Sequence, residues 1–260
     1  MSKQTLTRAD QNYVGAGYDA TLYATNGRPG VPVNMITRLD LGSPIPLDAD
    51  SLIKKAATTE LPTSGSIVYT AGVTSTPQDT ANTTTVSIQT NTGATDTVLA
   101  LDVPRNITAL ITHTSSIASG SILISGYDEY KAPMSETLAI AATGTSLAKV
   151  GKKAFKYIKS VTFTAGADMQ LNLIDVGHGD ILGLPYKLAD IGDLFKISRN
   201  NAVDTSATIA SAVTSTASTT TGDVRGTVHT GVACDTTSVV VWVGVTDPNS
   251  ATGLRGVTQA

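Results

Sequence analysis

Short segments in which apolar and polar residues alternate follow one another from residue 67 to 200, and turn residues separate them. Alternation with a period of two places successive side chains on opposite faces of a β-strand. A spacing of about 8–12 residues is typical of sandwiches and barrels. We therefore expect an all-β fold, an antiparallel β-sandwich or barrel-like domain over 67–200. Its predicted strands are residues 83–90, 97–103, 107–113, 121–127, 136–142, 157–164 and 169–175.

The composition also favours strands over helices. Hydrophobic residues make up 41% of the chain but aromatic residues only 5%, with one Trp and three Phe. The apolar residues are mostly Ala, Val, Leu and Ile, and the polar ones are mostly Thr and Ser, a mixture that suits pleated, half-buried strands. The expected core is therefore thin and aliphatic.

Two regions flank the strand series. Residues 1–66 are rich in Pro and Gly and poor in large apolar side chains, which predicts an extended N-terminal arm. Within this arm a short helix is expected at 49–57, capped by Asp48 or Asp50. Residues 201–260 hold a Ser/Thr-rich segment and a strong strand at 238–245. Paired with 225–232, that strand would form a C-terminal β-hairpin, either completing the sandwich or making a small second unit.

Charge and cysteine content exclude several partners. The formal net charge is −3 with 15% charged residues, which gives no reason to expect nucleic acid or an anionic membrane as partner. No apolar run approaches the roughly 20 residues of a membrane span, and the N-terminus has no apolar secretion signal. Cys234 is the single cysteine, so neither an internal disulfide nor a cysteine-built zinc site can form. We expect folding in a reducing cytoplasm.

The stretch "ISGYDEYKAPMSETLAI" (124–140) concentrates acidic residues around two tyrosines. On a strand Asp128 and Glu129 would point to opposite faces and could not act together as acid and base. Pro133 does not fit a central ladder, so "YKAP" is interpreted as a turn between two strands. Glu136 is then expected near Tyr127 across the hairpin. The prediction is a hairpin without a catalytic carboxylate pair.

Two other groups of polar residues are candidate sites. Four lysines, Lys149, Lys152, Lys153 and Lys156, would form a basic stripe on a helix. Gly151 and the apolar residues after it favour a turn followed by a strand, which scatters the lysines over both faces. His178 lies in "GHGD" close to Asp175 and Asp180, a set that could bind a metal. A polar loop is the simpler interpretation, so we expect no metal, cofactor or catalytic residue.

Three segments resemble a pattern in tailed-bacteriophage virion proteins. They are "ISGYDEYKAPMSETLAI", "GKKAFKYIKSVTF" (151–163) and "GDVRGTV" (222–228). In that pattern a strand ending in a Gly-x-Asp-x-Tyr turn leads to a Ser/Thr-Glu-Thr strand, and a Gly-Lys-x-Ala-Phe-Lys segment opens the next. The resemblance covers the middle and C-terminal halves. It implies a non-enzymatic component of the capsid surface, made in the cytoplasm of the bacterial host.

The function expected from this resemblance is capsid decoration. Such a cement protein would bind the major capsid protein from outside and tie neighbouring coat subunits together. A head fibre or tail component is the alternative within virions, and a surface carbohydrate-binding β-domain is the alternative from another class. Sugar-binding modules usually present clustered Trp and Tyr, whereas Trp242 is embedded in "VVVWVGV" and is expected in the core. An enzyme is the third class, and no assembled catalytic motif supports it.

The arm is the expected partner-binding element. Burying one apolar side chain contributes only about 1.5–3 kcal/mol, so several anchors must dock together to order an extended segment. We therefore expect the arm to order on assembly and the protein to be a homo-oligomer, a trimer by the resemblance and the aromatic-poor core. The predicted anchors are Tyr13, Tyr18, Tyr23, Met35 and Leu39.

Overall fold

The computed structural model describes residues 35–54, 61–71, 84–170, 172–188, 191–213 and 217–245. These residues form antiparallel β-sheets and contain no α-helix, which confirms the all-β prediction. Within them, no helix is long and apolar enough to cross a membrane. The elements are β1 (Met35–Asp40), β2 (Asp48–Ile53), β3 (Ser66–Thr70), β4 (Thr84–Gln89), β5 (Thr95–Thr112), β6 (Gly120–Tyr127), β7 (Pro133–Ile140), β8 (Ser146–Val150), β9 (Phe155–Ala165), β10 (Leu173–Gly183), the 3-10 turn η2 (Ile191–Asp193), β11 (Leu194–Arg199), β12 (Ala202–Val203), β13 (Thr208–Ala210), β14 (Thr227–His229) and β15 (Val239–Val245).

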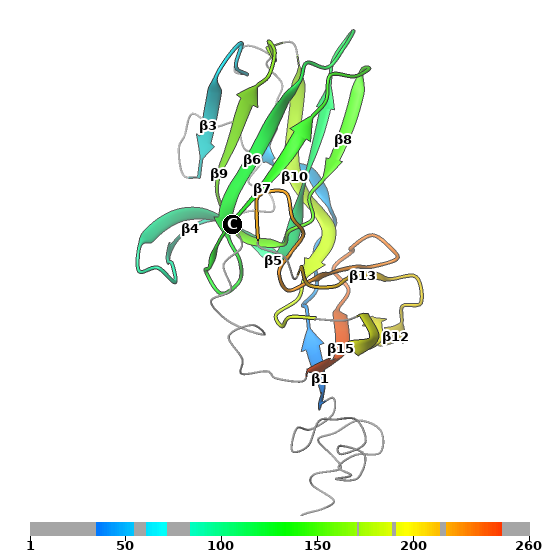
Figure 1. Cartoon of the computed structure of the whole chain (residues 1–260). Coiled ribbons are helices and arrows are strands. Elements are labelled where there is room, and N and C mark those ends of the chain that lie inside the picture. The colour runs from blue at the N-terminus through cyan, green and yellow to red at the C-terminus, as the bar shows by residue number, and fades with distance from the viewer. Residues whose placement is uncertain are drawn as a thin grey trace, which may run out of the picture.

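Eight of the strands form a β-sandwich whose topology follows from four pairings, three of them long-range and one a hairpin. β2 pairs with β10, β3 with β9, β5 with β8, and β6 with β7, all antiparallel. The chain is thus an antiparallel ribbon, folded back on itself at the β6–β7 turn. Wrapping this ribbon gives one layer in the order β2-β10-β5-β8 and a second in the order β3-β9-β6-β7. This strand order is that of a jelly roll (Figure 1).

The sandwich core lies between these two layers and is aliphatic, as the composition predicts. Fully buried residues of both layers meet there, among them Ile107, Ile111, Ile122, Ile124, Phe155, Phe163, Ile174 and Val176. The rings of Tyr69 and Phe163 add an edge-to-face contact with centroids 5.4 Å apart. Close packing of β-branched side chains therefore takes the place of large aromatic groups.

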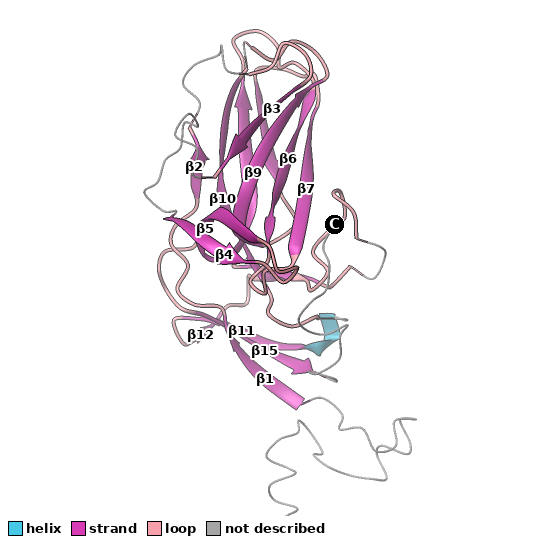
Figure 2. Cartoon of the chain, turned by 90° about the vertical axis from the view of Figure 1, so that its left-hand side faces the viewer, coloured by secondary structure: helices cyan, strands magenta, loops and turns pink. Residues whose placement is uncertain are grey.

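A second, four-stranded sheet lies at one end of the sandwich, in the order β1-β15-β11-β12 (Figure 2). Its inner face includes Leu39, Ile197 and Val241, which pack on Leu182 of β10 and Val228 of β14. The strands β13 and β14 continue the sandwich sheet from the end of β10. The first and last described strands of the chain, β1 and β15, thus pair with each other.

Pro104 lies within β5, a strand of 18 residues where two shorter ones were predicted. The pairing of β5 with β9 shifts register between Ala100 and Arg105, and its pairing with β10 shifts between His178 and Leu182. Because proline has no N–H to donate to a ladder, it fits at such a break. The strand bends there and passes from one layer into the other, so the two predicted strands are one.

Two sequence predictions in the flanking regions, the helix at 49–57 and the C-terminal hairpin, are wrong, and the described part of the arm is built into the sheets. Residues 48–53 of the expected helix 49–57 are strand β2, because pairing with β10 buries Leu52 and Ile53. The arm expected over 1–66 belongs to the fold wherever it is described, since its strands complete both sheets. The expected hairpin of 225–232 with 238–245 does not form, because β14 pairs with β10 and β13 while β15 pairs with β1 and β11.

Candidate functional site

The carboxylate-rich stretch 124–140 forms the β6–β7 hairpin, as predicted. Oδ1 of Asp128 accepts hydrogen bonds from the N–H groups of Tyr130 (2.8 Å) and Ala132 (2.9 Å). Lys131 takes a left-handed conformation with φ of 62°. Pro133 opens β7 opposite Tyr127, the position at a strand start where a missing N–H costs least. The Asp128 side chain therefore works as a turn cap.

Arg225 locks this turn from a distant part of the chain. Its Nη1 donates to Oδ2 of Asp128 at 2.5 Å, and the two side chains are only 3% and 4% exposed. The guanidinium also lies 4.8 Å from the ring centre of Tyr130, whose hydroxyl donates to the carbonyl of Pro185. Burial raises the pKa of the neighbouring Glu129. The segment "GDVRGTV" is thus tied to the "GYDEY" turn by a buried ion pair.

Glu136 does not approach Tyr127, contrary to the sequence expectation. It faces the interior opposite Ile124, while the Tyr127 hydroxyl donates to Asp96. The Glu136 carboxylate accepts the N–H groups of Lys152 (2.6 Å) and Lys153 (3.3 Å). Burial raises the pKa of Glu136 even though these hydrogen bonds oppose the rise.

The segment around Lys152 is held from two sides. A Cβ on Gly151 would lie 2.7 Å from Oε2 of Glu136, so only glycine fits there. On the other side the N–H of Ala154 donates to Asp223 at 3.0 Å. Asp128, Glu136, Lys153, Asp223 and Arg225 thus connect the three segments that carry the sequence resemblance, and we call these five residues the motif junction.

The lysines of this segment do not form a basic stripe. Lys153 is fully buried, and burial lowers its pKa. Nζ of Lys156 donates to the carbonyls of Leu101 and Asp102 at 2.7 and 2.8 Å. The segment is a turn followed by β9, as predicted, and these two ammonium groups are used inside the protein.

His178 belongs to strand β10 and not to a loop, and it takes part in a second buried cluster. Arg105, fully buried on β5, donates from Nη1 to Nδ1 of His178 (2.9 Å) and from Nη2 to the carbonyl of Ile45 (3.0 Å). Since arginine can only donate, the histidine proton is on Nε2. Burial and the adjacent guanidinium lower the pKa of His178 to about 4. Nη1 of Arg105 also pairs with Oδ1 of Asp102 at 3.3 Å. We call Asp102, Arg105, His178 and the carbonyl of Ile45 the Arg105 junction.

The Arg105 junction does not have the arrangement of a metal centre. Across the described ranges, no three His, Cys, Asp or Glu side chains converge as ligands would. The nearby thiol of Cys234 is buried, which raises its pKa to about 11 and keeps it protonated at neutral pH. The Arg105 junction joins β5, β10 and the segment after β1, so it connects the sandwich to the small sheet.

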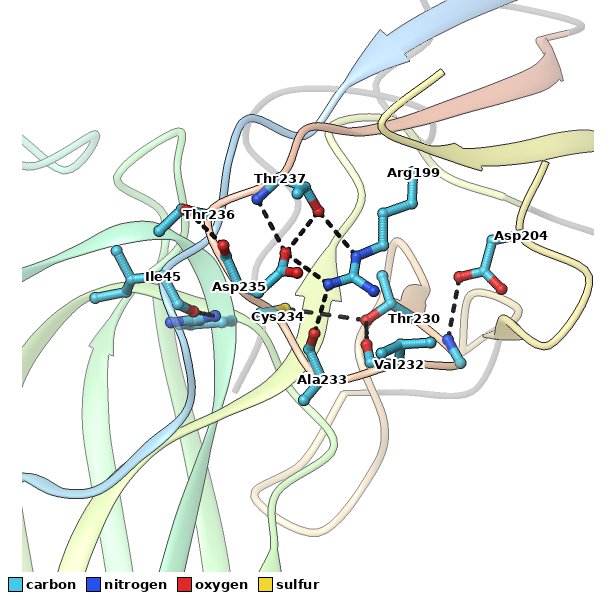
Figure 3. A network of polar contacts seen from close by, with 12 residues as sticks. Ile45, Arg199, Asp204, Thr230, Val232, Ala233, Cys234, Asp235, Thr236 and Thr237 are labelled. Carbon is cyan, nitrogen blue, oxygen red and sulfur yellow. Dashed lines mark hydrogen bonds and ion pairs between the residues drawn. The ribbon is translucent and has the colours of Figure 1, made fainter. Parts of the chain in front are cut away.

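A surface pocket of about 330 Å³ lies beside the small sheet. It is lined by Arg199, Asn200, Ala202, Val203, Asp204, Val232, Asp235 and Thr237. Figure 3 shows the polar contacts that shape it. Nε of Arg199 donates to the Thr237 hydroxyl (2.9 Å), and Nη2 donates to the carbonyl of Ala233 (2.8 Å) and pairs with Asp235 (2.6 Å). The guanidinium is therefore fixed in place at the pocket wall.

The two carboxylates of the pocket have different surroundings. The Thr237 hydroxyl, and then Arg199, hold the pKa of the exposed Asp235 below its usual value. Partial burial opposes ionisation of Asp204, yet hydrogen bonds from Ser206, Gly231 and Ala207 lower its pKa overall. Val203 and Val232, which also line the pocket, are 58% and 56% exposed. The pocket thus combines exposed apolar side chains with rigidly held polar groups, a combination that suits an apolar side chain of another molecule.

Sequence reasoning missed this pocket, although its turn signals were present. Asn200 and Asn201 connect β11 to β12 with φ of 47° and 63°, the two-residue hairpin that Asn favours. Asp204 then turns the chain by accepting the N–H groups two and three residues on. These signals lie at the boundary between the predicted sandwich, which ends at residue 200, and the Ser/Thr-rich segment, where alternation is vague.

Of the five predicted partner-binding anchors, only Leu39 has a described side chain. Tyr13, Tyr18 and Tyr23 lie outside the described residues, and Met35 is described only as the first residue of β1. Leu39 is 4% exposed in the core of the small sheet, so its assignment as an anchor for a partner is wrong. The alternating pattern of "MITRLD" faces Leu39 inward once β1 pairs with β15.

No protein-family model, no curated protein and no solved structure matches this chain.

Proposed function

We propose that this protein is a structural component of a tailed-phage virion that binds the outside of the capsid and cements neighbouring coat subunits. The observation that carries the proposal is the strand order of the sandwich. Jelly rolls are used by viral capsid and lectin domains among others. Because a fold alone does not fix a function, the resemblance of three segments to virion proteins is what narrows the choice.

The motif junction supports a structural role for the pattern on which that resemblance rests. Its charged groups, Asp128, Glu136 and Arg225, are buried and bonded to backbone or to each other. Buried charges of this kind are costly to leave unpaired and fix the relative position of the segments they join. The pattern thus encodes a rigid scaffold, which a protein under mechanical load on a capsid requires.

The small-sheet end is the capsid-facing end in this proposal. Seven large hydrophobic side chains are exposed among the described residues, and four of them, Ile191, Phe195, Val203 and Val232, lie between residues 191 and 232. The pocket opens between two of these four. Interfaces gain most of their energy where an apolar anchor fills such a pocket within a polar rim. The expected occupant is an apolar side chain of the coat protein.

Co-sedimentation with capsids that lack this protein tests the proposal. The wild type should pellet with the particles at a fixed ratio to coat subunits. Val232→Asp should weaken binding about tenfold or more, since it removes an exposed apolar side chain and adds a third carboxylate to the pocket of Asp204 and Asp235, which binding would desolvate. Val150→Asp is the matched control, because Val150 is 59% exposed but lies on β8 of the sandwich.

Capsid binding that is absent, or equally weak for both variants, contradicts the proposal. Binding to purified tails or fibres alone would favour the alternative virion position. The sedimentation coefficient of the protein without capsids tests whether the free protein is the expected trimer.

A further inference from the structure

The outer face of the β3-β9-β6-β7 layer carries a grid of hydroxyl groups. Its positions follow from the register of four neighbouring strands. Three rows cross the layer: Ser66–Thr164–Ser121–Ala139, Val68–Thr162–Leu123–Thr137 and Thr70–Ser160–Ser125–Ser135. Nine of these twelve side chains are Ser or Thr, and none is charged. We call the twelve residues the hydroxyl face.

Four residues of the hydroxyl face, Ser66, Val68, Ala139 and Thr164, are exposed, and the other eight are half-buried. In each strand the intervening residues, such as Ile122, Ile124 and Phe163, point into the core. Neighbouring strands are about 4.8 Å apart, and side chains on one face of a strand repeat about every 6.8 Å. Hydroxyls therefore stand at regular intervals, and those of Ser66 and Thr164 lie 2.8 Å apart.

The absence of charge from this face limits what it can bind. The chain as a whole is 15% charged, whereas these twelve residues include no charged side chain. The charged residue next to the grid on β9, Lys159, is paired with Asp96 at 2.9 Å. A polyanion such as nucleic acid needs cations to replace its counterions, and this face offers none.

A second copy of the chain is also a poor occupant. The large apolar side chains of the face are only Val68 and Leu123, and homodimer interfaces are rich in such groups. Ser and Thr residues are depleted or under-represented where binding energy concentrates in protein interfaces. The remaining match is a partner that is itself neutral, extended and covered with hydroxyls.

We infer that the hydroxyl face is a binding surface for neutral polysaccharide, one that contacts sugar rings through hydroxyl and aliphatic groups in place of the clustered Trp and Tyr that sugar-binding modules usually present. Each Ser or Thr hydroxyl both donates and accepts, which complements the hydroxyls of a sugar ring, while Val68, Leu123 and the Thr methyl groups contact the apolar edges of the ring. One such hydrogen bond replaces a bond to water and gains little. Affinity therefore comes from many contacts along one polymer chain, and a single sugar is bound far more weakly than the polymer.

Retention on insoluble neutral polysaccharides tests this inference with the full-length protein. The panel is cellulose, starch, chitin and unbranched β-1,3-glucan, with soluble alginate as the anionic comparison. The double variant Thr137→Lys/Thr162→Lys places two ammonium groups in the middle row of the face, one on the edge strand β7 and one on β9. The matched control is Thr112→Lys/Ala148→Lys on the outer face of the opposite layer, at half-exposed and exposed strand positions.

We expect wild type and control to be retained on at least one neutral polymer and the double variant to be retained about tenfold less, a loss of about 1.4 kcal/mol. Equal unfolding midpoints of the two double variants in urea show that both are folded. No retention on any neutral polymer, equal loss in both variants, or preference for alginate overturns the inference. It is also overturned if the wild type self-associates through this face, which sedimentation of the double variant as a smaller species reveals. None of these outcomes depends on whether the protein binds capsids.

Discussion

Buried charged side chains fix the places where this chain crosses between its sheets. Arg105 and Lys153 are fully buried and Arg225 is nearly so, although the chain as a whole is only 15% charged. A buried charge must be paired or hydrogen-bonded, and removing its partner is costly. With only three Phe and one Trp available, these polar contacts supply much of the positional specificity.

Breaking the ion pair of the motif junction should destabilise the protein strongly. Arg225→Ala leaves the buried carboxylate of Asp128 without its cation, and we expect a loss of about 3–5 kcal/mol in the free energy of unfolding. Arg38→Ala is the control, because Arg38 and Asp40 are more than half exposed and such pairs contribute less than about 1 kcal/mol. Urea unfolding followed by circular dichroism measures both, and a small effect of Arg225→Ala contradicts the role given to the junction.

The Arg105 junction predicts a dependence of stability on pH. The pKa of His178 falls from its ordinary 6.5 to about 4 on folding, because burial and Arg105 disfavour the charged ring. Between these values the unfolded chain binds a proton that the folded chain does not, so stability is complete above pH 6.5 and is lost as the pH falls toward 4. Keeping His178 neutral in the folded state thus accounts for about 3 kcal/mol of the pH-dependent change in the free energy of unfolding.

The charged groups that face His178 are Arg105 and Asp102 of β5 and Asp180 of β10. Replacing His178 alone leaves these groups in place, so the wild type is compared with His178→Gln. We expect the free energy of unfolding of wild type to fall between pH 7 and 4.5, and that of His178→Gln to fall less steeply. Urea midpoints at several pH values measure the difference. Parallel curves for the two proteins would show that His178 titrates normally in the folded state.

At the scale of elements, alternation in the sequence identified most strands but not their partners. Residues 83–90, 121–127 and 157–164 were predicted nearly at their observed bounds as β4, β6 and β9, because half-buried strands alternate. β2 and β14 were mistaken for a helix and part of a hairpin, since their partner β10 lies far away in sequence. The turn at Asp128 was predicted from Pro133, whereas Arg225 could not be placed beside it from local sequence.

Strand β1 should be required for stability of the free protein. Leu39→Ala removes a buried side chain from the core of the small sheet, which costs about 2–5 kcal/mol. Leu47→Ala is the control, because Leu47 is 51% exposed in the same region. Thermal and urea unfolding of the two variants measure the difference. An effect of Leu39→Ala that appears only in the capsid-bound protein would restore the prediction that Leu39 is an anchor.

The pairing of β2 with β10 depends on a glycine. A Cβ on Gly177 would lie 1.8 Å from the carbonyl oxygen of Asp48, which is backbone and can move only with the whole strand. Gly177→Ala should therefore cost about 1–3 kcal/mol or more and lower the hydrogen-exchange protection of β2. Gly144→Ala, where nothing lies within 4 Å, is the matched control. Unchanged protection of residues 48–53 would contradict this pairing.

At the scale of the whole molecule, the fold closes on itself from both ends of the described chain. The wrapped ribbon joins β2 to β10 and β3 to β9, and the small sheet joins β1 to β15. Such long-range pairings make the molecule one cooperative scaffold with two different surfaces, the exposed apolar residues around the small sheet and the uncharged hydroxyl face. On a capsid these surfaces would face the coat protein and the outside respectively.

The position of the protein on virus particles is the direct test of this account. Under the proposed function, cryo-electron microscopy of virions that contain this protein should show jelly-roll density on the outer capsid surface. We expect the small-sheet end to contact at least two neighbouring coat subunits and the hydroxyl face to remain open. Particles without this density, or density confined to the tail, would contradict the proposed function.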